Sequence, residues 1–220
     1  MKVLFLTPQV PYPPRQGAAI RNWGLISELT KRHRVAALSF LAAGQTPEAV
    51  APLQTPCRVE IETVPLPRRS LGERVRAMFT TRQPDMALRL ATESYARRLT
   101  DWLAREPFDV VHVGGIEMAP YLDVVEVARP RPLVVFDDLN CEYLLQKRAF
   151  LTDVRSPLRW VGAAYSLVQW RRLRRYEAQV CRRADRVIAV SEADAVKLRD
   201  LVAGRDVFVV PNGVDTRVYR

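Results

Sequence analysis

Four polar side chains, Asp137, Asp138, Asn140 and Glu142, stand together in the 220-residue sequence, directly after the apolar run 132–136. Polar groups that follow a buried parallel strand lie at the sheet edge where ligands bind, so the cluster predicts a ligand-binding site. The alternative is that Asp138 or Asn140 only caps the next helix. A cap does not require four polar side chains, which favours a mixed structural and ligand-binding role.

The histidines and cysteines do not form a recognisable catalytic or metal pattern. His33 and His112 lack metal-ligand spacing and a Ser/His/Asp arrangement, and His112 is better interpreted as a core or strand-end residue than as a catalyst. Cys57, Cys141 and Cys181 are an odd number without paired spacing, which argues against a disulfide framework and a zinc site. We therefore assign no catalytic residue and no metal, and expect a reducing cytosol.

Gly17 follows a proline-rich loop but belongs to no known phosphate-binding motif. The sequence lacks G-x-G-x-x-G and G-x-x-x-x-G-K-[ST], which argues against dehydrogenases and P-loop NTPases. We predict no cofactor. Gly17 could still let the backbone approach an anion at the start of the next helix, or it could serve only the turn.

The positive charge is concentrated in one segment. Residues 147–186 contain 11 basic and 3 acidic side chains, whereas the other 180 residues contain 23 and 21. Within the predicted helix Leu158–Arg183, aromatic residues alternate with arginines, as they do in helices that bind anionic bilayers. The basic residues concerned are Arg159, Arg171, Arg172, Arg174 and Arg175. The alternative is a helix that packs an apolar stripe on the sheet and leaves its basic face in solvent. Because no nucleic-acid-binding motif accompanies the charge, we do not expect a nucleic acid partner.

Alternating strands and helices position these residues. The apolar runs predict strands at Lys2–Leu6, Arg34–Leu41, Arg58–Leu66, Phe108–Val113, Pro132–Phe136, Val187–Val190 and Val207–Val210. Helices are predicted at Ala18–Arg32, Leu71–Phe79, Ala87–Arg105, Asn140–Phe150, Leu158–Arg183 and Glu192–Val202. This order is typical of an α/β domain with a doubly wound parallel sheet, and residues 1–220 are expected to form one such domain. No apolar stretch reaches the length of a membrane-spanning helix.

Six segments together resemble the N-terminal half of the retaining family 4 glycosyltransferases, which have the GT-B fold. They are residues 11–17 (PYPPRQG), 108–112 (FDVVH), 137–143 (DDLNCEY), 176–177 (YE), 184–192 (ADRVIAVSE) and 210–215 (VPNGVD). The last two are the most specific. The resemblance implies a Rossmann-like domain that forms one half of a GT-B enzyme.

In that family the N-terminal domain binds mainly the acceptor, and the C-terminal domain binds the nucleotide sugar. The sequence ends five residues after Asp215 and contains no pair of glutamates with the family's Glu-x7-Glu spacing. We therefore expect an acceptor-binding half without its donor-binding domain, inactive in isolation.

The resemblance also assigns candidate binding residues. It implies that Gly17 lies near the donor phosphates and Arg21 near the acceptor or a phosphate. Asp138, Asn140 and Glu142 would contact the acceptor, and Asn212 and Gly213 would form the floor of the cleft.

One position departs from the family pattern. Many members continue the fourth strand as His-x-His with the second histidine facing the acceptor. Here the sequence is His112-Val113-Gly114, so Gly114 stands where those members have the second histidine. His112 stays a candidate binding residue, and Glu117 is the candidate substitute for the missing histidine.

These observations lead to two functional hypotheses. The first is a transferase half whose parent enzyme moves a sugar from a nucleotide donor to a saccharide or lipid-linked acceptor with retention. The second is a noncatalytic α/β module that docks on an anionic membrane through its basic helix. Both predict a cytoplasmic protein, peripheral on the inner face of the membrane.

Overall fold

The structure is a computed structural model that describes residues 1–15, 17–42 and 59–213. Some residues singled out above lie outside these ranges. They are Gln16 of the proline-rich motif, Cys57, Arg58 at the start of a predicted strand, and Val214 and Asp215 of the last motif.

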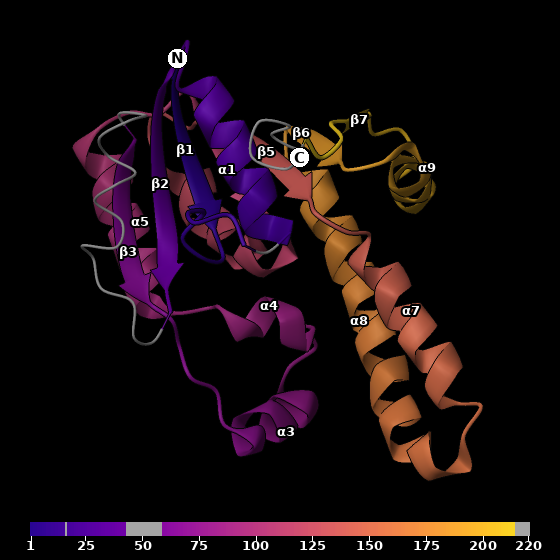
Figure 1. Ribbon diagram of the computed structural model, residues 1–220. Coiled ribbons are helices and arrows are strands. Elements are labelled where there is room, and N and C mark those ends of the chain that lie inside the picture. The colour runs from indigo at the N-terminus through magenta and orange to yellow at the C-terminus, as the bar shows by residue number, and fades with distance from the viewer. Residues whose placement is uncertain (16, 43–58, 214–220) are drawn as a thin grey trace.

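Within the described residues, parallel strands form one seven-stranded sheet in the order β3-β2-β1-β4-β5-β6-β7 (Figure 1). The strands are β1 (Lys2–Thr7), β2 (Arg34–Leu41), β3 (Glu60–Pro65), β4 (Val110–Gly114), β5 (Leu133–Asp138), β6 (Arg186–Ala189) and β7 (Val207–Val209). Because every neighbouring pair is parallel, the carboxyl ends of all the strands lie along one edge. The predicted α/β class is confirmed.

Helices cover both faces of the sheet. They are α1 (Gly17–Leu29), α3 (Leu71–Thr80), α4 (Asp85–Arg89), α5 (Glu93–Arg105), α6 (Leu122–Val127), α7 (Glu142–Asp153), α8 (Trp160–Arg183) and α9 (Glu192–Leu201), with 3-10 helices η2 (Ile116–Tyr121) and η3 (Pro157–Arg159). On one face, Phe5 of β1 packs in a cluster with Ile26 of α1. On the other face, Phe136 of β5 shares a larger cluster with Trp102 of α5 and Leu173 of α8. The alternation of side chains along each strand thus produces a double-wound core.

The predicted helix Ala87–Arg105 is two helices, α4 and α5. Thr92 separates them in an extended conformation, and its Oγ1 accepts a hydrogen bond from the backbone N–H of Tyr95 (3.3 Å). The hydroxyl of Tyr121 accepts a bond from the N–H of Thr92 (3.1 Å). A threonine followed by Glu93 is an N-terminal helix signal, and it overrides the continuous apolar spacing.

Helices α7 and α8 form a hairpin that extends beyond the carboxyl edge of the sheet (Figure 1). Helix α8 continues 24 residues to the start of β6. In the part of the chain that the structure describes, no helix has the length and apolar character required to cross a membrane.

Candidate functional site

A cavity of about 550 Å³ lies at the carboxyl edge of the sheet, among the residues that follow strands β1 to β5 and beside helix α4. Its walls are largely apolar. They include Phe40, Leu66, Met86, Leu90, Ile116 and Leu139, with the polar side chains of Gln9, Arg89, Glu117, Asn140 and Glu142. A few polar groups in a mainly apolar cavity are typical of a small-molecule site, so this is the candidate functional site.

Stacked aromatic rings support this cavity from the core. The ring of Tyr95 stacks on Phe40 and on Tyr121, with centroid distances of 4.6 and 4.2 Å. The Tyr95 hydroxyl donates to the carbonyl of Leu38 (2.7 Å), and the Tyr121 hydroxyl donates to that of Leu90. These contacts fix β2 and the end of α4, which form two of the walls.

Three of the predicted site residues meet on the polar wall. Glu117 forms an ion pair with Arg89, and the side-chain amide of Asn140 donates to Oε1 of Glu142 (3.3 Å). Burial raises the pKa of Glu142, and this effect, together with the nearby charge of Glu117, outweighs the opposing hydrogen bond from Asn140. Glu142 therefore keeps its proton to higher pH than an exposed glutamate, so its carboxyl group can donate as well as accept hydrogen bonds.

Two other predicted site residues, Arg21 and His112, do not line this cavity and instead contact Asp137. Arg21 is 4% exposed and binds both carboxylate oxygens of Asp137 at 2.8 Å. Its Nη1 also donates to the carbonyl of Val210 (2.7 Å) and to Oδ1 of Asn212 (2.9 Å). The Nε2 of His112 lies 3.2 Å from Oδ2 of Asp137. Arg21 therefore ties α1 to β5 and to the segment after β7.

The pKa of Asp137 is lowered by this network. Burial alone raises it, but the hydrogen bonds from His112 and Arg21 and their positive charges outweigh burial. Asp137 is therefore an ionised structural anchor and is not available to a ligand.

Close packing at Gly114 disfavours a side chain such as the histidine of the family pattern. A Cβ atom at this position would lie 3.1 Å from the carbonyl oxygen of Leu6 and 3.2 Å from Oδ1 of the buried Asn22. The backbone of β4 here is packed against β1 and α1. Glu117, three residues further on, instead supplies a polar group to the cavity.

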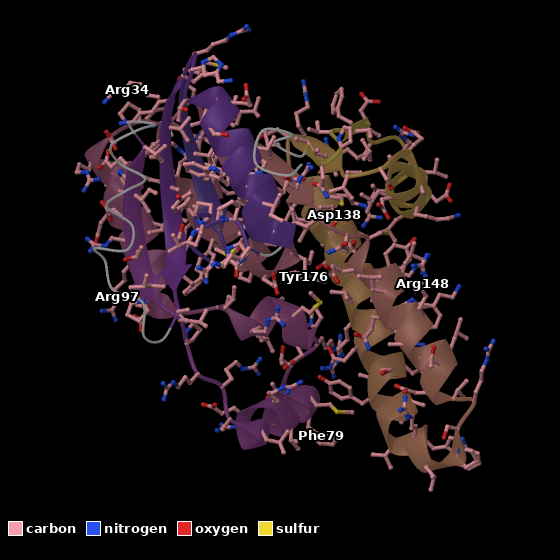
Figure 2. The ribbon with its side chains drawn as sticks, viewed as in Figure 1. Arg34, Phe79, Arg97, Asp138, Arg148 and Tyr176 are labelled. Carbon is pink, nitrogen blue, oxygen red and sulfur yellow. The ribbon has the colours of Figure 1, made fainter. Side chains whose placement is uncertain are left out.

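Asp138 is 1% exposed and lies where the sheet meets the α7–α8 hairpin (Figure 2). Neither of its carboxylate oxygens meets an N–H or O–H donor among the described residues, but its carboxyl group is within hydrogen-bonding reach of Glu177 on α8. Two ionised carboxylates cannot bond to each other, so one of them carries a proton. Asp138 does not line this cavity, because side chains alternate along β5 and that of Asp138 is buried in the core.

Glu177 is the structural residue whose role sequence reasoning missed. Its Oε1 accepts from the N–H of Glu142 (3.0 Å) and its Oε2 from that of Tyr143 (2.9 Å), so it caps the start of α7 from a different helix. Neither Asp138 nor Asn140 provides the cap that the alternative interpretation required. Burial is the main cause that raises the pKa of Glu177 to about 7. In the sequence, a glutamate among the apolar residues of the predicted helix Leu158–Arg183 was the signal that could have indicated a buried structural role.

One group of side chains in the described part of the chain has the spacing of a cation site. The ligand atoms of Asp138, Cys141 and Glu177 lie within 4.8 Å of one another, and all three residues are buried. However, burial raises the pKa of both carboxyl groups and of the Cys141 thiol, and both oxygens of Glu177 accept backbone N–H groups. A shared proton accounts for this group without a metal.

Gly17 begins α1, and the adjacent Ala18 lines the cavity. The first turn of α1, residues 17–20, is fully described and contains no acidic side chain. The positive end of the helix dipole therefore lies beside the cavity, where it favours an anion. Asn212 and Gly213 are exposed at the end of the described chain.

The arginines predicted to bind a membrane divide into two groups. Arg159 of η3 and Arg171, Arg174 and Arg175 of α8 are exposed. Arg172 is half-buried and donates to the carbonyl of Met78 at the end of α3 (2.6 Å) and to that of Gln83 (3.5 Å). Arg172 therefore holds α3 against α8.

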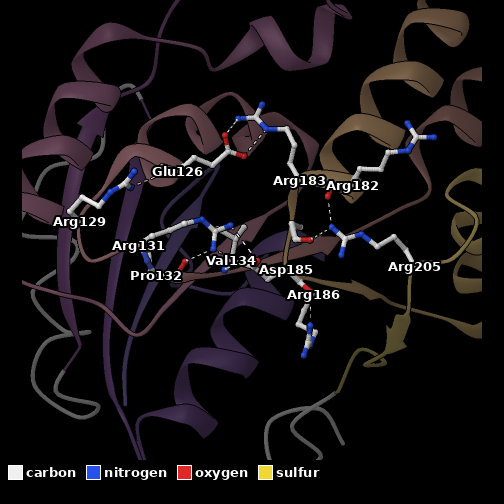
Figure 3. Close-up of polar contacts among 11 residues, drawn as sticks. Glu126, Arg129, Arg131, Pro132, Val134, Arg182, Arg183, Asp185, Arg186 and Arg205 are labelled. Atoms are coloured by element: carbon white, nitrogen blue, oxygen red, sulfur yellow. Dashed lines mark hydrogen bonds and ion pairs between the residues drawn. The ribbon is translucent and has the colours of Figure 1, made fainter.

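The family-like segment around Asp185 lies at the opposite edge of the sheet (Figure 3). Oδ2 of Asp185 accepts from the N–H of Val134 (2.7 Å) and from Arg131 (2.9 Å). Arg183 pairs with Glu126 (2.8 Å), and Arg205 donates to the carbonyls of Arg182 and Ala184. This network joins the amino ends of β5 and β6, so its role is structural.

A family model described as Glycosyltransferase Family 4 matches residues 15–218. No curated protein sequence matches the chain. Among solved structures, apo UGT2 of Phytolacca americana is similar with a TM-score of 0.55 and 12% identity, over 97% of this chain and 52% of that chain. A UDP-glucosyltransferase from Polygonum tinctorium capable of glucosylating indoxyl, in complex with 3,4-dichloroaniline, has a TM-score of 0.54 and 14% identity over 97% and 52%. Arabidopsis thaliana UGT89C1 complexed with UDP has a TM-score of 0.52 and 12% identity over 97% and 53%.

The chain thus spans about half the length of the solved structures it matches. At these identities the likeness establishes the fold, a Rossmann-like half of a GT-B glycosyltransferase, as the sequence motifs predicted. The family model adds agreement over nearly the whole sequence. The chain therefore belongs to Glycosyltransferase Family 4.

Proposed function

We propose that the chain is the acceptor-binding half of a retaining glycosyltransferase that moves a sugar from a nucleotide-sugar donor to a hydroxyl of a saccharide or lipid-linked acceptor. The cavity at the carboxyl edge carries this proposal, because it presents Glu117, Asn140 and Glu142 beside apolar walls in a chain of this family. The half-length match supports the view that a second domain supplies most of the donor site.

The chemistry required of this half is positioning. Glu142 and Asn140 would hold the acceptor hydroxyl, and the start of α1 at Gly17 would face the donor phosphates. A helix N-terminus stabilises the negative charge that develops on the departing phosphate. Retention in this fold needs no protein nucleophile, so orientation and charge stabilisation would carry catalysis. One similar protein, Arabidopsis thaliana UGT89C1, has been solved in complex with UDP and separately with UDP-L-rhamnose, which supports a nucleotide-sugar donor.

Binding of an alkyl glycoside tests the proposal. Octyl β-D-glucoside, kept below its micellar concentration, combines a saccharide with an apolar chain and can be titrated calorimetrically. Glu142→Ala and Asn140→Ala should each weaken binding about tenfold, as expected when one well-formed hydrogen bond is lost.

The matched control is Glu93→Ala. Glu93 is the first residue of α5, as Glu142 is of α7, but its side chain is 77% exposed and pairs only with Arg97 of its own helix among the described residues. Equal affinity in all three variants, or an equal loss in Glu93→Ala, would contradict the proposed acceptor site.

The second candidate function is a noncatalytic module that docks on anionic membrane at the cytoplasmic face. The exposed Arg159, Arg171, Arg174 and Arg175 favour it. Such a module would bind vesicles but not the glycoside, so the calorimetric experiment separates the two functions.

A further inference from the structure

Helix α3 turns its apolar stripe toward solvent. Leu71, Val75 and Phe79 recur every fourth residue and are 73, 52 and 80% exposed, and none of the ten residues of this fully described helix is buried. The helix is nevertheless well formed, since Ser70 and Glu73 make a reciprocal capping box at its start.

The orientation of α3 is fixed from its other side. Arg74 pairs with Asp85 of α4 (3.2 Å) and lies close to Tyr165 on α8. Arg172 of α8 donates to the carbonyl of Met78. These contacts hold α3 against the hairpin with its apolar stripe facing outward.

A second group of exposed apolar side chains lies at the free end of the α7–α8 hairpin. Leu158 is 99% exposed, Val161 88% and Trp160 62%. Figures 1 and 2 show this end of the hairpin and α3, with Phe79 labelled, at the same end of the molecule. That end is also the one toward which the carboxyl ends of the strands point (Figure 1).

The segment that carries the second apolar group is strongly basic. Residues 145–175 contain eight basic side chains and one acidic side chain, Asp153, a net charge of +7. Asp153 pairs with Arg159 at 3.4 Å. Exposed apolar residues within a basic segment are typical of segments that enter the headgroup region of an anionic bilayer. A second copy of the chain would instead bring two like-charged surfaces together, which opposes self-association.

We propose that Leu71, Val75 and Phe79 of α3 and Leu158, Trp160 and Val161 of the hairpin form one insertion surface for an anionic lipid bilayer. A second step rests on the proposed function: by holding the cavity at the bilayer, this surface favours an acceptor anchored in that bilayer. Helix α4 connects the insertion surface with the cavity. Its Asp85 binds Arg69, just before α3, and Arg74 of α3, whereas its Met86 and Arg89 line the cavity.

Vesicle binding by the full chain tests the surface directly. Vesicles of phosphatidylcholine mixed with an equal amount of phosphatidylglycerol should sediment the wild-type chain. Val75→Ser with Phe79→Ser, and separately Leu158→Ser with Val161→Ser, should each weaken this binding about tenfold or more, because two side chains lose apolar burial in the bilayer. The control Val127→Ser replaces a valine at the end of α6 whose exposed fraction (71%) lies between those of Val75 and Val161, and this variant should bind vesicles normally.

A second readout distinguishes insertion from purely electrostatic contact. Lipids brominated in their acyl chains should quench wild-type tryptophan fluorescence on binding, and Trp160→Phe should remove most of that quenching. Unchanged vesicle binding in both double variants, or no quenching, would overturn the proposal. The proposal would also be overturned if the wild type did not bind lipid but self-associated in a concentration-dependent way that the double variants abolish.

Neither measurement needs a sugar donor or acceptor. Vesicle binding without any glycoside binding would therefore reject the proposed transferase function and leave the insertion surface in place.

Discussion

Replacing Asp138 with asparagine tests whether a buried proton joins β5 to α8. Glu177 accepts two backbone N–H groups, so it is the acceptor of the pair and Asp138 is the donor. Asparagine has nearly the same size and keeps an N–H donor toward Glu177, but it does not titrate. Asp138→Asn should therefore fold normally and lose part of the pH dependence of stability.

The sign of that dependence follows from the two raised pKa values. Burial raises the pKa of Glu177 from 4.5 to about 7, and it raises that of Asp138 well above its ordinary value. The folded pair then holds protons that the unfolded chain has released, so stability is greatest below the unfolded pKa values and falls as pH rises. Each retained proton costs about 1.4 kcal/mol of stability per pH unit, and the shift of Glu177 alone corresponds to about 3 kcal/mol.

Urea unfolding followed by circular dichroism between about pH 5 and pH 8 measures this effect. The free energy of unfolding of Asp138→Asn should fall less steeply than that of the wild type, by about 1.4 kcal/mol per pH unit. Glu177→Gln should lose about 1 to 3 kcal/mol at the acid end of this range, since one backbone N–H is left without its acceptor, and it should also lose the pH dependence that Glu177 contributes. Asp200→Asn, a substitution at a side chain 65% exposed, is the control. Parallel pH profiles for the wild type and Asp138→Asn would refute the shared proton.

Three further predictions concern the network around α1, the packing of β4 and the donor. Arg21→Ala should cost about 3 to 5 kcal/mol in urea unfolding because it leaves Asp137 buried without its partner, and Arg21→Lys should not restore the loss, since lysine cannot bind both oxygens. Gly114→Ala should cost about 1 to 3 kcal/mol, because its Cβ would lie 3.1 Å from the carbonyl of Leu6; a variant as stable as the wild type would contradict the packing argument. The chain alone should show no transferase activity, and calorimetry with UDP-glucose and GDP-mannose should detect no binding in the micromolar range. A micromolar dissociation constant, about −8 kcal/mol, would instead assign donor binding to this half.

The sheet and the position of the site were predictable because they depend on local patterns. Apolar runs bounded by prolines and glycines identified the strands, and the polar residues after the fifth strand identified the edge where the cavity lies. The direction of each side chain was not predictable in the same way. Adjacent residues of a strand face opposite sides, so Asp137 meets Arg21 while Asp138 meets Glu177, and these partners lie 116 and 39 positions away along the chain.

The long helix shows a similar limit. Its alternation of aromatic and basic residues was compatible with a membrane-facing helix and with a helix packed on the sheet by an apolar stripe. In the structure Leu173 is buried in the core, Trp170 stacks on Phe150 and Arg172 binds α3. The most exposed apolar residues of this segment lie instead at the start of the helix. Tertiary packing decides which part of an amphipathic segment remains free, and sequence spacing does not contain that information.

Amide chemical shifts of the nitrogen-15-labelled chain, recorded during titration with octyl β-D-glucoside and separately with UDP-glucose, test the central claim most directly. If the cavity is the acceptor site, the glycoside should shift the amides of Gly115, Glu117, Asn140 and Glu142, and UDP-glucose should not shift them to a comparable extent. Glycoside-induced shifts confined to the opposite edge, around Arg131 and Asp185, or no shifts at any concentration below micelle formation, would contradict it.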